Sequence, residues 1–343
     1  MQVAVSIIIL AKDEQEQVRE SLIQLSEQTI FDRKDLQIEI VFAANGCNDD
    51  TAGHAEAALA EIALSKSFSF LVKNLEEGGK SRTWNRAVHE FSNPNADFLI
   101  FLDADVFLFD ENVLSEILSS LQSDESLHVV TGRPLKAIAR KPDPSPLERL
   151  SLTMSRHTSW VNAICGSLYV GQASVLRRYY LPDATPGEDG FLNALVTTEG
   201  FASESIAQRV LQHHRPTHFF DPVGLGQFIS HERRMIVGTI INSWAFELLH
   251  AREDKSDIGS YIRDLNEKSP GWLNDIVQQR INGRGWVIPR SLLFRRFVRR
   301  GEARRLGSRA MIYGLASLAT VLSIPSMLLA NRTLRSTDPA SYW

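Results

Sequence analysis

The chain has 343 residues, of which 43% are hydrophobic and 23% are charged, and this length leaves room for one large domain plus an appendage. The composition is that of an ordinary globular protein. A formal net charge of -4 argues against a general nucleic-acid binder, because contacts with phosphates need a surplus of Lys and Arg on one face.

The first 130 residues alternate apolar, β-branched runs with segments of helical length. This alternation is typical of a parallel sheet with crossover helices. We therefore expect an α/β fold with a doubly wound, mostly parallel sheet flanked by helices, in which ligands bind beyond the carboxyl ends of the strands. Strands are expected at residues 3–10, 38–43, 68–72, 98–102 and 128–131, and helices at residues 18–25, 52–63, 81–91 and 112–121.

The rest of the chain has a weaker pattern. Residues 133–146 are basic and contain proline, which is typical of a linker or flexible loop rather than a strand. Between residues 147 and 226, one apolar run at 167–170 predicts a further strand among polar loops, and residues 232–282 are expected to be mainly helical and amphipathic. The predicted organisation is a ligand-binding α/β domain over residues 1–240, a helical extension over 241–294 and a basic and apolar tail over 295–343.

The tail combines two features that suit a membrane. Residues 310–330 contain no charged residue and approach the roughly 20 residues that cross a bilayer core. Polar residues and Pro325 interrupt the run, so a spanning helix, an interfacial helix and a buried hairpin broken at Pro325 all stay open, and a purely soluble tail is the least favoured. A block of arginines at residues 295–309, just before this run, would keep the preceding domain on the cytoplasmic face or bind anionic headgroups. Its arginines are Arg295, Arg296, Arg299, Arg300, Arg304, Arg305 and Arg309, with Glu302 as the only acid.

The cysteine content and the N-terminal sequence both indicate the same cellular compartment. Cys47 and Cys165 are too few for a disulfide framework or a thiolate metal site, so they are expected to be reduced thiols in a cytosolic compartment. Residues 3–10 are too short for a signal-peptide core and have no basic segment before them. We therefore expect the protein to be located at the cytoplasmic face of the cell membrane.

Two carboxylates follow the strongly apolar strand predicted at residues 98–102. Asp103 and Asp105 are separated by one residue, and alternation along a strand places both on the same side. There they can reach one hard cation, Mg²⁺ or Mn²⁺, that also holds a diphosphate. A solvated turn with an acidic cap explains the pair equally well when it is taken alone, but its place after this strand favours the metal site.

Polar residues also follow the other predicted strands. Asp, Asn and Gly at such positions suit hydrogen bonds to a base and a ribose, and a Gly pair permits a tight backbone beside a lysine that offsets phosphate charge. Helix capping or turn chemistry explains each stretch better when it is taken singly, but together they converge on one rim of the sheet. The residues are Asp13 and Glu14 after the first strand, Asn45 and Asp49 after the second, and Gly78, Gly79, Lys80 and Asn85 after the third.

Five motifs thus follow one another in a fixed order. They are Ser6-Ile7-Ile8-Ile9 with Asp13-Glu14, then Asn45-Gly46-Cys47-Asn48-Asp49-Asp50-Thr51, then Gly79-Lys80 with Asn85, then Asp103-Ala104-Asp105, and finally Glu188-Asp189. Their order and spacing, over roughly residues 3–240, resemble the family 2 glycosyltransferases of GT-A fold. There are three departures: Cys47 stands where the family usually has Ser, Asn45 where many members have Asp, and Asp13 where Asn is common.

The resemblance implies roles for the acidic motifs. Asp103 and Asp105 match the family's DxD motif, which binds the nucleotide diphosphate through a divalent metal. Glu188 and Asp189 match the family's Glu-Asp motif, whose Asp acts in inverting members as general base on the acceptor hydroxyl. The chemistry agrees, because a hydroxyl attacks poorly unless a carboxylate within about 3 Å takes its proton. Acids at a helix N-terminus explain that pair as well.

The resemblance also implies positions around the nucleotide. Asp49 matches the Asp of the family's Asn-Gly-Ser-x-Asp-x-Thr turn, and the pair after the first strand, Asp13 and Glu14, matches an early element near the base. Farther on, Arg233 and Arg234 match an Arg-containing element that meets the diphosphate, and His231 is the candidate to complete the metal site.

The predicted activity is transfer of a sugar from a nucleotide-diphosphate donor to an acceptor hydroxyl, dependent on Mg²⁺ or Mn²⁺ and with inversion. A UDP-sugar is the first expectation for the donor, and a saccharide or lipid-linked molecule for the acceptor. Nucleic acid is not an expected partner, and the tail is expected to contact the membrane. The alternatives are a nucleotidyltransferase acting on a sugar phosphate, which lacks its usual Gly-rich opening here, and a non-catalytic membrane-associated GT-A scaffold.

Overall fold

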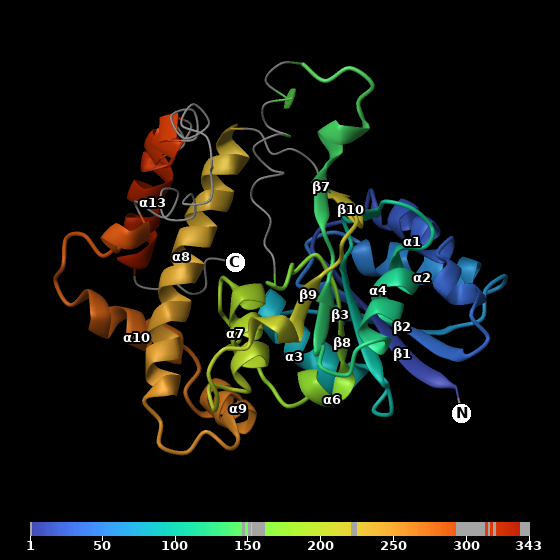
Figure 1. The fold of residues 1–343 in the computed structure, drawn as a ribbon, viewed down its shortest axis with the longest axis horizontal. Helices are drawn as coiled ribbons and strands as arrows, with labels where there is room; N and C mark the ends of the chain where they lie inside the picture. The colour runs from blue at the N-terminus through green and yellow to red at the C-terminus, as the bar shows by residue number, and fades with distance from the viewer. Residues whose placement is uncertain are drawn as a thin grey trace. The chain divides into compact units, whose positions relative to one another are not determined.

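The fold is described from a computed structural model (Figure 1). The structure describes residues 2–145, 148–149, 152, 162–220, 225–292, 313–314, 316–317 and 320–336. The chain divides into two compact units. The first unit comprises Met1–Ala184, Glu188–Pro222 and Arg252–Ser269, and the second comprises Thr185–Gly187, Val223–Ala251 and Pro270–Trp343.

The first unit is built on a seven-stranded sheet. Its strands are β1 (Val3–Ala11), β2 (Leu36–Asn45), β3 (Ser69–Leu75), β4 (Phe98–Asp103), β6 (Val129–Thr131), β8 (Leu168–Gln172) and β9 (Val210–Gln212). The order is β3-β2-β1-β4-β8-β6-β9. β8 runs antiparallel to both of its neighbours, and the other pairs are parallel. The expected α/β fold with a mostly parallel sheet is confirmed.

Helices cover both faces of this sheet. The helices of the first unit are α1 (Val18–Ser26), α2 (Thr51–Ile62), α3 (Lys80–Arg86), α4 (Val113–Gln122), α6 (Ala173–Leu176), α7 (Glu188–Thr198) and α9 (Ile258–Lys268). On one face Ile7 and Ile40 share a core with apolar residues of α1, α2 and α4. On the other face Trp84 of α3 stacks on Phe101 with ring centroids 5.8 Å apart. Burial on both faces explains why β1 and β4 are almost wholly apolar.

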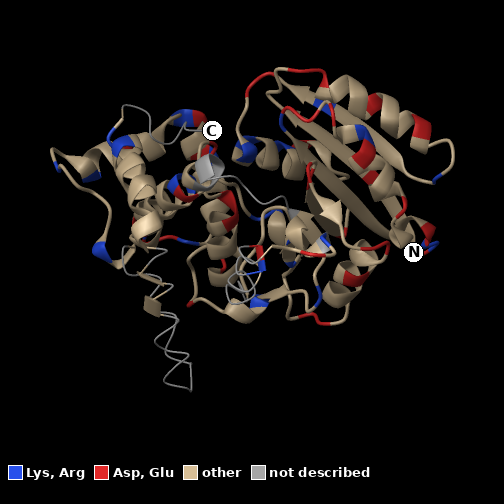
Figure 2. Ribbon diagram, turned by 90° about the horizontal axis from the view of Figure 1, so that it is seen from above, with Lys and Arg blue, Asp and Glu red and all other residues tan. Residues whose placement is uncertain are grey.

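Charged residues lie mostly outside the strands of this sheet. Figure 2 shows charged residues on the helices and loops of the first unit, whereas its strands are mostly tan. This distribution is the one expected of a sheet buried between layers of helices.

A second sheet in the first unit corrects one prediction. It contains β5 (Phe107–Leu108), β10 (His218–Phe220) and β7 (Pro134–Lys136), in that order. The interpretation of residues 133–146 as a linker without a strand is therefore wrong at β7. The strand forms because it pairs with the distant β10 in parallel register, and its proline is its first residue, where a strand tolerates proline.

The second unit is helical. Its helices are α8 (Leu225–His250), α10 (Trp272–Ile281) and α13 (Ile324–Leu334), and both α10 and α13 pack against α8. The helical prediction for residues 232–282 is confirmed, with α9 inside that range belonging to the first unit. α8 runs through residue 240, at which the sequence analysis placed a domain boundary.

The predicted tail is described only in part. The arginine block of residues 295–309 lies outside the described residues, and so do residues 310–312, 315 and 318–319 of the uncharged run. No helix in the described part of the chain combines the length and the apolar character that a bilayer span requires.

Candidate active site

The register of the sheet brings the predicted motifs to one edge. Asp103 at the end of β4 pairs with Leu10 of β1, and Ala11, the last residue of β1, pairs with Ala44 of β2. Asn45 at the end of β2 pairs with Leu75, the last residue of β3. The loops that follow these strands therefore begin side by side, at the carboxyl edge of the sheet.

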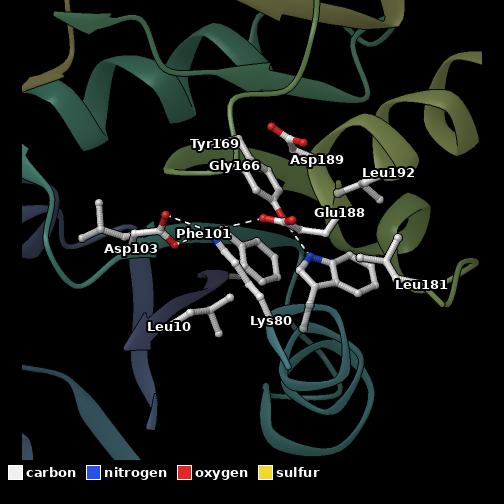
Figure 3. Close-up of a pocket in the computed structure, with 12 residues that line it drawn as sticks. Leu10, Lys80, Phe101, Asp103, Gly166, Tyr169, Leu181, Glu188, Asp189 and Leu192 are labelled. Carbon is white, nitrogen blue, oxygen red and sulfur yellow. Dashed lines mark hydrogen bonds and ion pairs between the residues drawn. The ribbon is translucent and has the colours of Figure 1, made fainter. Parts of the chain in front are cut away.

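A lysine links two of the predicted acids at this edge. The Nζ atom of Lys80, the first residue of α3, lies 2.7 Å and 2.8 Å from the two carboxylate oxygens of Asp103. It also lies 3.4 Å from an oxygen of Glu188, at the start of α7. Figure 3 shows the Glu188 carboxylate directed at Lys80, whereas that of Asp189 points away from this chain of ions. Three motifs spread over more than 100 residues of sequence thus meet through one ammonium group.

The charges of Asp103, Lys80 and Glu188 depend on one another. Burial alone would lower the pKa of Lys80, but the carboxylates of Asp103 and Glu188 outweigh it, and the pKa is raised. Burial raises the pKa of Asp103 even though the neighbouring ammonium opposes this shift, and Asp105 raises it further. Lys80 is thus held as a cation, and Asp103 sits where a second positive charge would be favourable.

Negative charge accumulates around Glu14, in the loop after β1. Burial raises its pKa from 4.5 to about 7, and the next largest causes are the charges of Asp105, Asp49, Asp103 and Asp13. Asp105 itself is exposed, in the turn that follows β4. The structure therefore brings five of the predicted acidic residues into one electrostatic cluster, with Lys80 as a cation at its border.

This cluster gives a pH-dependent prediction for Glu14→Gln. The carboxylate has a pKa of about 7 in the folded chain and 4.5 as its reference, so its penalty grows as the pH rises between these values and is fully present above them. At pH 8 we expect the free energy of unfolding of the variant to exceed that of the unsubstituted chain by on the order of 1–2 kcal/mol. The gain is expected to vanish below pH 4.5. Urea titrations at several pH values measure it.

The control for this prediction is Glu16→Gln, which neutralises an exposed glutamate two residues away. It is expected to leave the free energy of unfolding nearly unchanged across the same pH range. Equal effects of the two substitutions would contradict the assignment of the strained carboxylate to Glu14.

The loops after β1 and β2 hold each other through Asp13, Cys47 and Asp49. Asp13 has a positive φ of 55°, and its backbone N–H donates to the Cys47 Sγ atom at 3.3 Å. Its carboxylate accepts the backbone N–H of Asn48 at 2.6 Å. Hydrogen bonds from the Thr51 hydroxyl are the main cause that lowers the pKa of Asp49. These two acids therefore shape the loops after β1 and β2 from within, and their predicted contacts with a nucleotide stay predictions.

The same three side chains form a group with metal-ligand chemistry. Their potential ligand atoms lie within 4.8 Å of one another, and theirs is the one such group of three in the described part of the chain. The predicted ligands Asp103, Asp105 and His231 are not in it. Because Asp13 and Asp49 already accept backbone hydrogen bonds, we interpret the group as a loop contact.

Asn45 and Asn85 have positioning contacts. The Oδ1 atom of Asn45 accepts from the backbone N–H of Gly79 at 2.7 Å and from the Thr83 hydroxyl at 2.8 Å, which fixes the start of α3 and hence Lys80. Asn85 exchanges two hydrogen bonds with the backbone of Leu181, each 2.8 Å long. Both asparagines are buried, and these contacts point into the protein scaffold.

Gly166 is a site residue that the sequence analysis did not single out. A Cβ atom at this position would lie 3.3 Å from the Cβ of Asp189 and 3.4 Å from a carboxylate oxygen of Glu188. The next residue, Ser167, accepts the backbone N–H of Asp103 at 3.1 Å. The turn before β8 therefore packs against both acidic motifs. A glycine directly before the predicted strand at 167–170 was the available signal.

A small cavity lies between the two acidic motifs. It has a volume of about 10 Å³, room for about one water molecule. Trp84 and Tyr169 line it together with the ion chain, and the Trp84 indole donates to the Tyr169 hydroxyl at 2.6 Å. Both rings are almost fully buried. Tyr169 was not singled out from the sequence.

The remaining predicted residues lie on α8. His231, Arg233 and Arg234 belong to the second unit, so they are described with that unit and their predicted contacts with a donor stay predictions. His231 is exposed, and both arginines are half-buried.

Comparison with known proteins agrees with this fold. A mannosyltransferase, PcManGT from Pyrobaculum calidifontis in complex with GDP-Man and Mn²⁺, has 14% sequence identity, with 98% of this chain and 89% of that chain covered at a TM-score of 0.56. Glucosyl-3-phosphoglycerate synthase from Mycobacterium tuberculosis is 14% identical, with 70% and 79% covered at a TM-score of 0.48. At these identities the first likeness shows a common fold. No curated protein matches the chain.

The sequence itself carries the assignment. Residues 6–180 match the family described as Glycosyl transferase family 2, and this range contains β1, β2, α3 and β4 with their motifs. It covers more than half of the 343 residues. The chain therefore belongs to family 2 of the glycosyltransferases, and the family predicted from the ordered motifs is confirmed.

Proposed function

We propose that this glycosyltransferase moves a sugar from a nucleoside diphosphate to an acceptor hydroxyl, with inversion and with a divalent cation. The observation that carries the proposal is the chain of ions from Asp103 through Lys80 to Glu188, at the carboxyl edge of the sheet. It places a carboxylate suited to a cation and a pair of acids suited to proton transfer in one small region. Inversion needs such a base on the side of the sugar opposite the leaving group.

The residues present fit a divalent cation. Five carboxylates share the edge, and burial together with their repulsion raises the pKa of Glu14 to about 7. Carboxylate oxygens are the ligands that Mg²⁺ and Mn²⁺ prefer. We assign Asp103 and Asp105 as the ligands. A bound cation would offset the charge that develops on the departing diphosphate. The mannosyltransferase of similar fold is itself described in complex with GDP-Man and Mn²⁺.

Side chains of the protein would supply the proton transfer and the stabilisation of the leaving group. Asp189 takes the proton of the acceptor hydroxyl as its oxygen bonds to the sugar's anomeric carbon. The bond from that carbon to the diphosphate breaks, and the nucleoside diphosphate leaves with the electron pair. Lys80 stabilises the leaving group's negative charge from its place beside Asp103. Glu188 keeps the lysine in this position.

We also propose the chemical class of the donor and of the acceptor. A UDP-sugar is our first candidate donor, with Asp13, Glu14 and Asp49 near its nucleoside, and the GDP-Man of the similar structure makes a GDP-sugar the second. Arg233 and Arg234 are candidates for diphosphate contacts. For the acceptor we propose a saccharide or a lipid-linked molecule at the cytoplasmic face of the membrane, in the synthesis of a polysaccharide or glycolipid.

Thermal stabilisation by donors tests the proposal directly. The protein is melted with a panel of UDP- and GDP-sugars, each with and without Mn²⁺. A ligand at 100 times its Kd should add about 2.7 kcal/mol to the free energy of unfolding, which raises Tm by several degrees. We expect one donor class to do this only with Mn²⁺, and Asp105→Ala to remove the effect.

Asp124→Ala is the matched control, because Asp124 is an exposed aspartate in the loop after α4. It should respond to the donor like the unsubstituted chain. Stabilisation by a nucleoside triphosphate and a sugar phosphate, with release of pyrophosphate, would instead support a nucleotidyltransferase. No metal-dependent shift with any donor would support a scaffold and contradict the proposal.

A further inference from the structure

Helix α13 of the second unit exposes an apolar face. Its buried face, formed by residues such as Met327, Ala330 and Leu334, belongs to the helix that packs against α8. On the other side, Ile324 is 47% exposed and Leu328 is 56% exposed. A surface helix normally presents polar residues there. This helix is apolar on both sides of its first two turns.

The exposed apolar residues form one stripe. Ile324 and Leu328 lie four residues apart, on the same side of α13, and the exposed Val321 comes just before the helix begins. Leu322 and Leu329 flank them and are exposed as well. We call this set the α13 stripe. It comprises Val321, Leu322, Ile324, Leu328 and Leu329.

Basic residues continue the same side of the helix. Arg332 and Arg335 follow the stripe and are exposed. Arg332 lies four residues after Leu328, so it shares that face. The sequence places seven arginines and one glutamate at residues 295–309, shortly before the stripe. The face is therefore apolar with cations at its end, and further cations precede it in the chain.

A hollow opens where the stripe meets these cations. It has a volume of about 310 Å³ and is lined by Arg233, Leu329, Arg332, Thr333 and Ser336. Guanidinium groups and hydroxyls are the donors that bind phosphate oxygens well. An apolar side chain at the border would suit the carbon chain attached to such a phosphate.

We propose that the α13 stripe and its hollow dock on the surface of a bilayer that contains anionic phospholipids. An interfacial helix of this kind buries its apolar side at the level of the headgroups, while its cations meet the lipid phosphates. A second copy of the chain is a poorer occupant, because an isologous contact would bring the arginines of both copies together. The inference gives a surface to the membrane location proposed above.

Vesicle binding tests the inference. The full chain is sedimented with vesicles of phosphatidylcholine alone or mixed with phosphatidylglycerol. We expect binding to the mixed vesicles that weakens as salt is added. Leu328→Gln and Arg332→Gln should each reduce this binding by about tenfold. The controls Leu64→Gln and Lys34→Gln remove an exposed leucine and an exposed lysine from the first unit, and both should bind normally.

Three outcomes would overturn the inference. One is the absence of vesicle binding. Another is binding that neither stripe variant reduces. A third is a dimer in light scattering that Leu328→Gln dissociates, which would make a second copy the occupant. If vesicle binding is absent, inorganic phosphate identifies the alternative occupant: a rise in Tm at millimolar phosphate that Arg332→Gln removes would assign the hollow to a free anion.

The test is separate from that of the proposed function. Metal-dependent stabilisation by a donor is measured in solution without vesicles, and Leu328→Gln should leave it unchanged. Loss of vesicle binding with donor binding intact, or the reverse, shows which of the two proposals has failed.

Discussion

Asp189→Asn is expected to lower kcat by on the order of 10²–10⁴-fold, the usual contribution of a positioned general base. The amide keeps the shape of the side chain but cannot take a proton from the acceptor. The substitution leaves the contacts among Lys80, Asp103 and Glu188 in place. We therefore expect KM for the donor and the melting temperature to stay close to those of the unsubstituted enzyme. Steady-state kinetics with the donor identified by thermal stabilisation measures the effect.

Glu188→Gln provides the comparison for that variant. It replaces the carboxylate that faces Lys80, so its main effects should be on stability and on donor KM. If Glu188→Gln lost the greater part of kcat and Asp189→Asn little, then the base would be Glu188. The roles assigned to the two acids would have to be exchanged.

The second large effect is expected for Lys80→Met, which keeps the aliphatic stem and removes the charge. The side chains of Lys80, Asp103 and Glu188 are 31%, 23% and 21% exposed, so solvent screens the loss only in part. We expect the free energy of unfolding to fall by on the order of 1–3 kcal/mol at pH 8. Loss of the ammonium raises the pKa of Asp103 further, so the deficit should shrink as the pH falls and that carboxyl takes up a proton.

Divalent cations sharpen the test of Lys80→Met. Mn²⁺ should restore a larger share of stability to this variant than it adds to the unsubstituted chain, because the unbalanced carboxylates bind it. Lys80→Arg is the control that keeps the charge and should lose little stability. Equal stability of Lys80→Met and the unsubstituted chain at pH 8 would contradict the assigned role of the ammonium.

The sequence predicted the elements that carry strong local patterns. The expected strand at residues 98–102 became β4, ending one residue later, and the expected helix at 52–63 became α2 with a shift of one residue. These elements are long, and burial on two faces makes their strands almost wholly apolar. Their ends were displaced where polar loop residues continue the ladder, as at Asn45 of β2.

Short elements were missed for the opposite reason. β5, β7, β9 and β10 have two or three residues each, too few to show a period. They exist because distant segments pair with them, as β10 pairs with Pro134 and Leu135 of β7. The position of β8 between β4 and β6 also depends on long-range pairing that local residues do not encode.

For the site, residue type and order predicted the acids, and only the fold revealed how they are paired. Lys80 was expected at a phosphate, yet its contacts with Asp103 and Glu188 depend on how α3 and α7 pack. Asn85 was expected beside the donor, which stays a prediction, and the fold shows its side chain holding the backbone of Leu181. Gly166 was missed because its importance comes from what an added Cβ would touch.

The antiparallel direction of β8 has a consequence for variation within such enzymes. Ser167, just before β8, hydrogen-bonds to Asp103 at the end of β4, so the register of the ladder alone fixes Gly166 beside the acids. A side chain added at residue 166 would therefore meet Glu188 and Asp189 while the ladder kept the backbone in place.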